Sequence, residues 1–188
     1  MGPRLRKFAL AAHLTFSVGW IGAAFSYLAL GVGAVSSQDA RTVRAAWVAM
    51  ELTGWYVIVP LALASLLTGI VMALGTRWGL FRHYWVLFSL VLTVLATVVL
   101  LLHMPTVSAL AREAQEAEGA RLQELGGDLL HPGLGLVVLL SVQVMNVYKP
   151  PGMTRYGRRK HREELEDRKR QDQDPAPARP GGAGGLGR

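Results

Sequence analysis

The chain contains no cysteine, and only 18% of its 188 residues are charged. Without cysteine, the chain has no disulfide, thiolate metal site, iron–sulfur cluster or cysteine nucleophile. Also missing are the Gly-Lys-Ser/Thr phosphate loop, the His-Glu-x-x-His zinc motif and the Gly-x-Ser-x-Gly nucleophile elbow. A soluble domain normally carries about a quarter charged residues. What remains is histidine and carboxylate chemistry in a chain that is 51% hydrophobic.

The few charges are unevenly distributed. The formal net charge is +7, and residues 149–188 hold 11 of the 20 Lys and Arg residues. The positive excess therefore belongs to a tail, and the apolar body is close to neutral. This distribution excludes a uniformly basic nucleic-acid-binding domain, and we expect no nucleic-acid partner.

Four long apolar runs dominate the first 152 residues. A transmembrane helix needs about 20 mostly apolar residues, and we place spans near residues 8–30, 46–73, 84–105 and 129–148. A soluble protein rarely needs four buried helices of this length. The sequence therefore predicts an all-α fold: residues 1–152 form a polytopic four-transmembrane-helix bundle in a lipid bilayer.

Positive charges near the span ends predict the orientation of the bundle. Basic residues gather before the first span, between the second and third spans, and after the fourth. The loop after the third span instead carries five acids against Arg112 and Arg121. We therefore expect both termini in the cytoplasm, which an even number of spans permits.

The tail, residues 153–188, has a basic, Pro- and Gly-rich composition that predicts disorder, with transient helix at most over residues 163–170. Its basic block could contact anionic lipid headgroups. The alternative is that it serves only as a topology signal and a solvated end.

Helix propensity and proline add local expectations. Residues 108–125 are rich in good helix formers, so we expect the third loop to be helical in part. Asp128 is placed to cap the fourth span, and Pro60 should kink the second.

Three ionisable residues from different spans fall at one predicted depth. Glu51, His103 and His131 all lie near the outer side of the bilayer when 1.5 Å is allowed for each residue. Imidazoles can ligate a metal or haem iron, and a carboxylate can bind a metal or handle protons. The alternatives are that the histidines are simply hydrated, and that Glu51 pairs with Arg44 or reaches outer water.

His13 is the deepest histidine and lies toward the cytoplasmic side. Ser17 and Trp20 follow on the same helix face, which we expect to face the bundle. His13 is a candidate cofactor ligand, and hydrogen-bonded packing is the alternative. His83 begins the third span beside aromatic residues and fits an interface position better.

Several short stretches resemble known membrane families. The segment from Lys7 to His13, Trp20-Ile-Gly22, the Glu51-to-Trp55 stretch and His131-Pro-Gly resemble a family of four-span bacterial membrane proteins of unknown function. His13 followed by Trp20 and Gly22 is more weakly similar to the opening of membrane protoporphyrinogen oxidases and copper-resistance D-type domains. The first resemblance implies a bacterial cell membrane, and the second implies that His13 ligates haem.

Three functions are open from the sequence. The leading one is a small redox protein that holds b-type haem or a metal, with an outer site at His103, His131 and Glu51 and an inner site at His13. The second is a non-catalytic membrane subunit or scaffold, either as a homo-oligomer or with a membrane partner. The third is a small proton- or solute-coupled transporter that uses Glu51 and the Pro60 kink.

Overall fold

The computed structural model describes residues 2–75 and 79–173, and within them it is helical, without a β-strand. The elements are α1 (Pro3–Ser36), α2 (Ala40–Thr53), the π-helical turn η1 (Gly54–Ile58), α3 (Val59–Gly75), α4 (Tyr84–Glu116), α5 (Ala120–Glu124), α6 (Leu130–Tyr148) and α7 (Arg155–Gln173). Four of the helices, with α2, η1 and α3 counted as one, are long and apolar enough to cross a membrane. The predicted all-α four-span bundle is confirmed.

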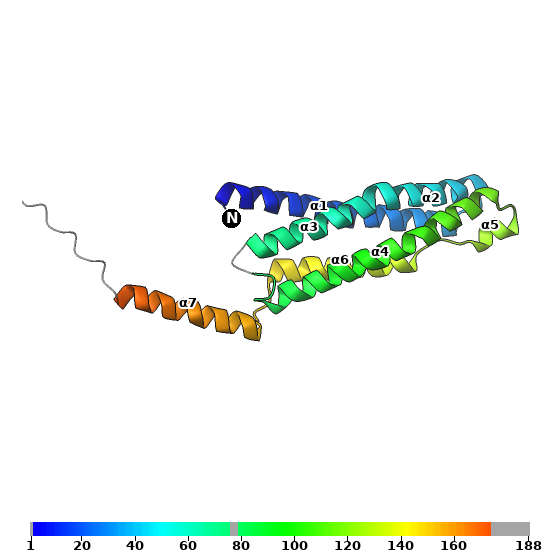
Figure 1. The fold of residues 1–188 in the computed structure, drawn as a ribbon. Helices are drawn as coiled ribbons and strands as arrows, with labels where there is room; N and C mark the ends of the chain where they lie inside the picture. The colour runs from blue at the N-terminus through cyan, green and yellow to red at the C-terminus, as the bar shows by residue number, and fades with distance from the viewer. Residues whose placement is uncertain (1, 76–78, 174–188) are drawn as a thin grey trace, which may run out of the picture.

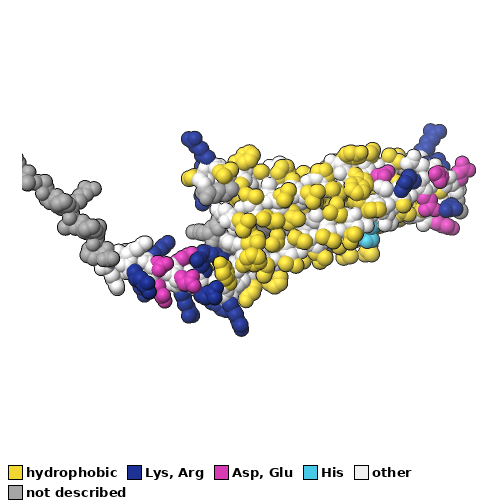
Figure 2. Space-filling view, in the orientation of Figure 1, with side chains coloured by type: hydrophobic (Ala, Val, Ile, Leu, Met, Phe, Trp, Pro, Cys, Tyr) yellow, Lys and Arg dark blue, Asp and Glu magenta, His cyan; other side chains and the backbone are white. Residues whose placement is uncertain are grey.

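The four spans run up and down along one long axis (Figure 1). We call the end that holds Pro3, Gly75 and Tyr148 the tail end, and the end that holds Ser36, Ala40 and Glu116 the loop end. A broad band of hydrophobic side chains covers the middle, while basic and acidic side chains gather at both ends (Figure 2). The N-terminus and α7 therefore lie at the same end of the bundle.

Two helices are much longer than the predicted spans. With 34 and 33 residues, α1 and α4 are each about 50 Å long, against about 30 Å of hydrocarbon. The third loop is helical in part, as expected over residues 108–125: α4 continues past Pro105 to Glu116, and the short α5 follows. The loop end therefore forms a lobe that projects beyond the start of α6.

This loop-end lobe contains the most closely packed part of the molecule. Trp47, Met50, Ala111 and Ala114 are 0% exposed, and Leu122 is 1% exposed. They come from α2, α4 and α5, so the lobe ties together segments far apart in the chain. Fully burying a large apolar side chain contributes about 1.5–3 kcal/mol, which makes this lobe a firm anchor for the spans.

Arg44 completes the lobe by binding the end of α4. Its Nε donates to the carbonyl of Ala114 at 3.2 Å, and a terminal nitrogen donates to the carbonyl of Ala117 at 2.7 Å. A helix leaves its last carbonyls without partners, and a cation there also complements the helix dipole. Arg44 therefore binds the end of α4, whereas pairing with Glu51 was one of the alternatives for that acid.

The second span keeps one buried face through an unusual turn. Its buried positions Met50, Gly54, Ile58 and Ala62 recur every four residues. In a regular α-helix, positions four residues apart are rotated by about 400° about the helix axis, which is about 40° more than a full turn. The buried face would therefore drift around the helix by about 40° at each step. The π-helical turn η1 holds an extra residue and absorbs the drift. It directly precedes Pro60, whose missing N–H leaves a gap in the α-helical ladder.

The prediction of disorder is wrong over residues 155–162 and 171–173, which form α7 together with residues 163–170, where a transient helix was expected; residues 174–188 lie outside the described part of the chain. α7 is docked at its start. Thr154 N–H donates to the carbonyl of Arg82 at 3.0 Å, and Glu164 pairs with the Arg82 guanidinium at 2.5 Å. His83 and Met153 form an isolated β-bridge beside these contacts. Composition alone does not predict these contacts, because they join residues that are far apart in the sequence.

We predict that Arg44→Gln destabilises the protein by about 1.5–3 kcal/mol, since hydrogen bonds from a charged donor are worth this much. Arg41→Gln, on an exposed side chain of the same helix, should stay within about 0.5 kcal/mol of wild type. Thermal unfolding in detergent measures both. Equal stability of the two variants would contradict the capping role.

The Arg82 hydrogen bond lowers the pKa of Glu164 below its ordinary value. Because the folded pKa is depressed, this contribution to docking is present at neutral pH and is lost as the pH falls through the lowered pKa. A spin label on Lys169→Cys, unique in a chain without cysteine, should become more mobile in that acidic range. Glu164→Gln should be mobile at every pH, whereas the Glu166→Gln control should keep the wild-type profile.

Candidate metal centre

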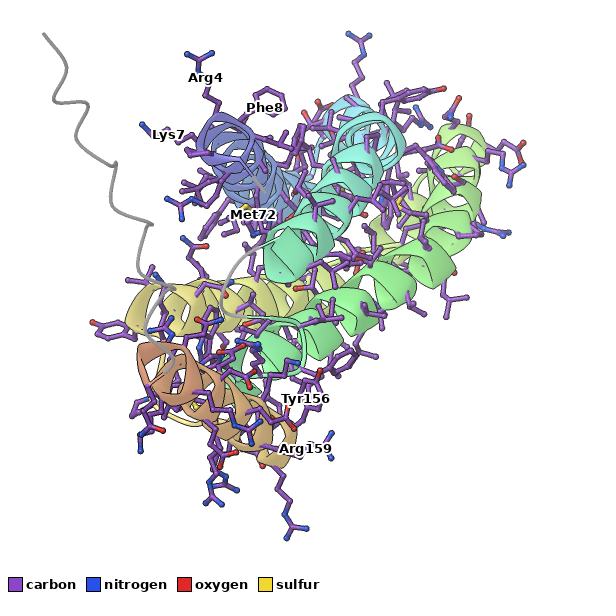
Figure 3. All side chains as sticks on the ribbon, turned by 60° about the vertical axis from the view of Figure 1, so that its left-hand side comes forward. Arg4, Lys7, Phe8, Met72, Tyr156 and Arg159 are labelled. Atoms are coloured by element: carbon purple, nitrogen blue, oxygen red, sulfur yellow. The ribbon has the colours of Figure 1, made fainter. Side chains whose placement is uncertain are left out.

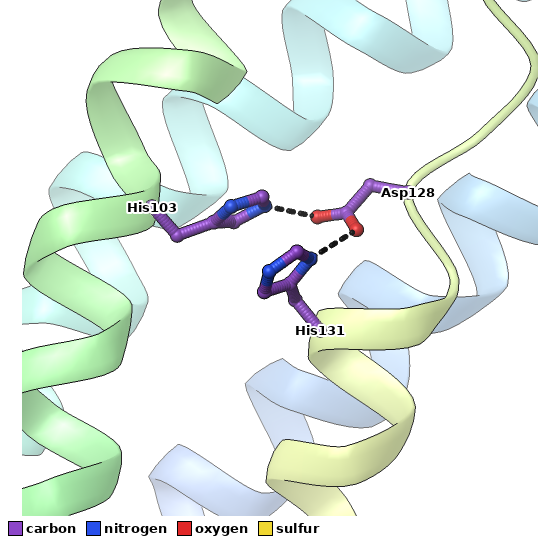
Figure 4. Close-up of side chains that lie close together, drawn as sticks. All are labelled: His103, Asp128 and His131. Atoms are coloured by element: carbon purple, nitrogen blue, oxygen red, sulfur yellow. Dashed lines mark hydrogen bonds and ion pairs between the residues drawn. The ribbon is translucent and has the colours of Figure 1, made fainter.

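Three ionisable side chains meet at the loop end of the hydrocarbon region, where α6 begins (Figure 4). The Nε2 atom of His103 lies 2.6 Å from one carboxylate oxygen of Asp128, and the Nδ1 atom of His131 lies 3.3 Å from the other. The two imidazole rings stack with centroids 3.7 Å apart and planes 17° from parallel. One carboxylate thus joins two imidazoles that come from α4 and α6.

Tyr27 of α1 adds a third helix to the cluster. Its hydroxyl donates to the carboxylate of Asp128 at 3.5 Å, a long hydrogen bond. The Asp128 side chain is 8% exposed, whereas His131 is 46% exposed. A buried carboxylate is costly unless it is paired and hydrogen-bonded, and here α1, α4 and α6 each supply a partner.

Close backbone contact between α1 and the loop before α6 places Asp128. A methyl group at Gly31 would lie 2.7 Å from the carbonyl oxygen of Asp128, and one at Gly127 would collide with the carbonyl of Gly31. Glycine at both positions therefore lets the loop lie directly on α1. Asp128 was predicted to cap the fourth span. In the structure Leu129 is the N-cap residue, without a side-chain cap, and the carboxylate turns to the histidines.

An apolar pocket of about 270 Å³ extends from the cluster into the bundle. Its walls come from α1, α4 and α6, and include Trp20, Leu95, Val99, Leu134 and Val138. Leu95, Val99 and Leu134 are also exposed on the lipid-facing surface. The polar cluster therefore stands at one end of a space that is otherwise lined by hydrocarbon side chains.

The structure brings together two of the four residues predicted to form sites. His103 and His131 meet as their predicted depths required, but the acid beside them is Asp128. Glu51 is partly buried on α2 and is outside this group.

His13 lies apart from the cluster, in the half of the bundle toward the tail end. Its Nδ1 lies 3.1 Å from the hydroxyl of Thr68 and 3.2 Å from the carbonyl of Ser65, both on α3. Ser17, one turn along α1, shares a hydrogen bond with the Ser65 hydroxyl at 2.8 Å. The ring also packs on Gly69. These contacts match the packing alternative that the sequence left open.

Asp128 could have been recognised from the sequence. It stands only three residues before His131, so the two side chains are close together at the start of a span. Asp128 was read only as a capping residue because an acid before a helix usually has that role. Its contact with His103 spans 25 positions of sequence, and local spacing does not predict it.

The cluster has the chemistry of a metal site. Each residue offers one ligand atom, and these atoms all lie within 4.8 Å of one another. Two imidazole nitrogens and one carboxylate oxygen form the ligand set of many zinc and non-haem iron centres, which keep further positions open. In the described part of the chain this is the one such group of three.

Comparisons of the chain with protein-family models, with curated proteins and with solved structures find no match. The resemblances stated for the sequence therefore stay predictions.

The close approach of Gly31 to Asp128 can be tested by comparing the effect of alanine on stability at Gly31 and at Gly33. Gly31→Ala should destabilise the protein by about 1–3 kcal/mol, because the added methyl must displace the loop backbone. A methyl at Gly33 meets nothing within 4 Å, so Gly33→Ala should be neutral or stabilise the helix by up to about 1 kcal/mol. Thermal unfolding in detergent measures both, and a harmless Gly31→Ala would contradict the close contact.

Proposed function

We propose that this protein is an integral membrane metalloprotein that binds one divalent transition-metal ion through His103, Asp128 and His131. The observation that carries the proposal is the convergence of the three ligand atoms within 4.8 Å, from two helices and the loop between them. In the absence of cysteine, histidine and carboxylate are the ligands that such a chain can offer.

The position of the cluster supports an ion that reacts or exchanges. Three protein ligands leave at least one position of a tetrahedral ion open, as in catalytic zinc sites. His131 is partly exposed, which gives the ion a path from water, and the apolar pocket adjoins the same cluster. With an iron ion, the two-histidine, one-carboxylate set would also serve the redox role predicted from the sequence.

Haem receives less support than a single ion. In haem ligated by two histidines, the nitrogens face each other across the macrocycle. The stacked rings of His103 and His131, only 3.7 Å apart, leave no space for it between them. His13 is held by hydrogen bonds within the α1–α3 contact. We therefore place a metal ion, and not haem, at the centre of the proposal.

Fewer observations support the scaffold and transporter alternatives. A scaffold needs no convergence of ionisable groups, and the transporter was predicted from Glu51, which lies outside the cluster. We further propose that both termini face the cytoplasm of a bacterial cell, because Lys and Arg gather at the tail end. The metal centre would then lie at the outer surface of the membrane.

Metal binding can be tested with a matched pair of acids. Zn²⁺ should bind the purified protein at one ion per chain. Asp128→Asn should lower the Zn²⁺ affinity at least about 100-fold, since loss of even an outer-shell partner lowers metal affinity about 10–100-fold. Glu51→Gln should bind as wild type. His103→Ala and His131→Ala should lose the ion, while His161→Ala, on exposed α7, should keep it. Competition with a chelating dye measures each affinity.

Two results would overturn the proposal. One is equal Zn²⁺ affinity in Asp128→Asn and Glu51→Gln, which would assign binding to scattered surface groups. The other is a Soret band in the purified protein with no metal beyond the haem iron, which would favour haem. The absorption spectrum and elemental analysis of one preparation give both answers.

A further inference from the structure

A second and larger cavity lies between the four spans in their tail-end half. Its volume is about 890 Å³, and α1, α3, α4 and α6 all contribute walls. It extends from Trp20, which also lines the pocket beside the metal centre, to Lys149 at the end of α6. The lobe holds the spans together at the loop end, and this cavity separates them at the other.

The mouth of the cavity is positively charged. Arg6, Lys7 and Lys149 are among its lining residues, and those in the described part of the chain include neither Asp nor Glu. Arg4 lies on the same helix and is not a lining residue, and it projects away from the bundle (Figure 3). Cations without acids around one opening create a positive potential that attracts an anion.

The deeper walls carry polar groups at fixed positions. On one side, His13, Ser17 and Ser65 form the hydrogen-bonded contact between α1 and α3. On the other side, Ser89 donates to Asn146 at 3.4 Å, and the amide of Gln143 lines the cavity without a hydrogen bond to the described part of the chain. These polar groups occupy only part of the deeper wall.

The remaining lining is apolar. Leu10, Leu14, Leu66, Met72, Leu90 and Leu139 come from all four spans. Met72 projects between α1 and α3 (Figure 3). An inorganic anion would leave these apolar walls uncovered, and a neutral lipid would not be attracted by the positive potential at the mouth. A ligand that satisfies both has an anionic head and a hydrocarbon body.

We propose that this cavity binds a small amphiphilic anion, a carboxylate or phosphate with one hydrocarbon chain. The head lies between Arg6, Lys7 and Lys149, and the chain runs along α1 toward Trp20, about 20 Å away at the helical rise. The volume of about 890 Å³ lies near the upper end of the usual range for small-molecule sites. This site is distinct from the metal centre and does not depend on it.

Dodecyl phosphate is the probe, with protein purified in dodecyl maltoside. The two molecules share an alkyl chain and differ in head charge, so native mass spectrometry can compare their adducts directly. We expect one dodecyl phosphate per chain, displaced by salt. The double variant Arg6→Gln, Lys7→Gln should weaken binding about tenfold or more, and Arg4→Gln should match wild type.

The position of the chain needs a second measurement. Dodecyl phosphate brominated near the end of its chain should quench part of the tryptophan fluorescence, and Trp20→Phe should remove that part. Unaltered quenching in Trp20→Phe would place the chain elsewhere and overturn the proposal.

Three further results would also overturn it. They are inorganic phosphate binding as tightly as dodecyl phosphate, the neutral detergent forming equal adducts, and Arg4→Gln weakening binding as much as the double variant. Zn²⁺ affinity of the double variant should equal that of wild type, which separates this outcome from any failure of the metal proposal.

Discussion

The buried carboxylate of Asp128 is the constraint on which the arrangement of the spans depends. A carboxylate that is only 8% exposed at the edge of the hydrocarbon needs partners on every side. It finds them on Tyr27, His103 and His131, so α1, α4 and α6 must meet at one level. The small size of Gly31 and Gly127 allows the loop to come close enough. The carboxylate that needs these partners and the glycines that allow the close contact therefore lie at the same place in the bundle.

That point divides the bundle into two unlike halves. Beyond it, α2, the end of α4 and α5 pack around Trp47 and Met50 in a lobe closed by Arg44. On the other side α1, α3, α4 and α6 enclose a large cavity with a basic mouth. A bundle held firmly at one end can remain open at the other, because the lobe supplies the packing that the open half lacks. Trp20 lines both cavities and is 4% exposed.

Sequence reasoning predicted the features that depend on composition and rise per residue. Four spans follow from apolar length, and the meeting of His103 with His131 follows from their depths. It missed what depends on contacts distant in sequence: the partners of Asp128, the cap that Arg44 supplies, and the docking of α7 on Arg82. Glu51 was predicted to join the histidines because depth identifies a level and leaves the direction of a side chain open. Directions depend on helix rotation, which η1 alters in the second span.

The π-helical turn η1 therefore sets how α3 is rotated about the helix axis relative to α2. Residues before it and residues after it keep the same neighbours, α1 and α4, only because one extra residue is stored there. Loss of any single residue from this turn would allow a regular helix and rotate α3 by about 100°. Ser65 and Thr68 would then leave His13, and Ala62 would leave the core. The span can therefore tolerate many substitutions of side chains, but its length between Met50 and Ala62 is fixed.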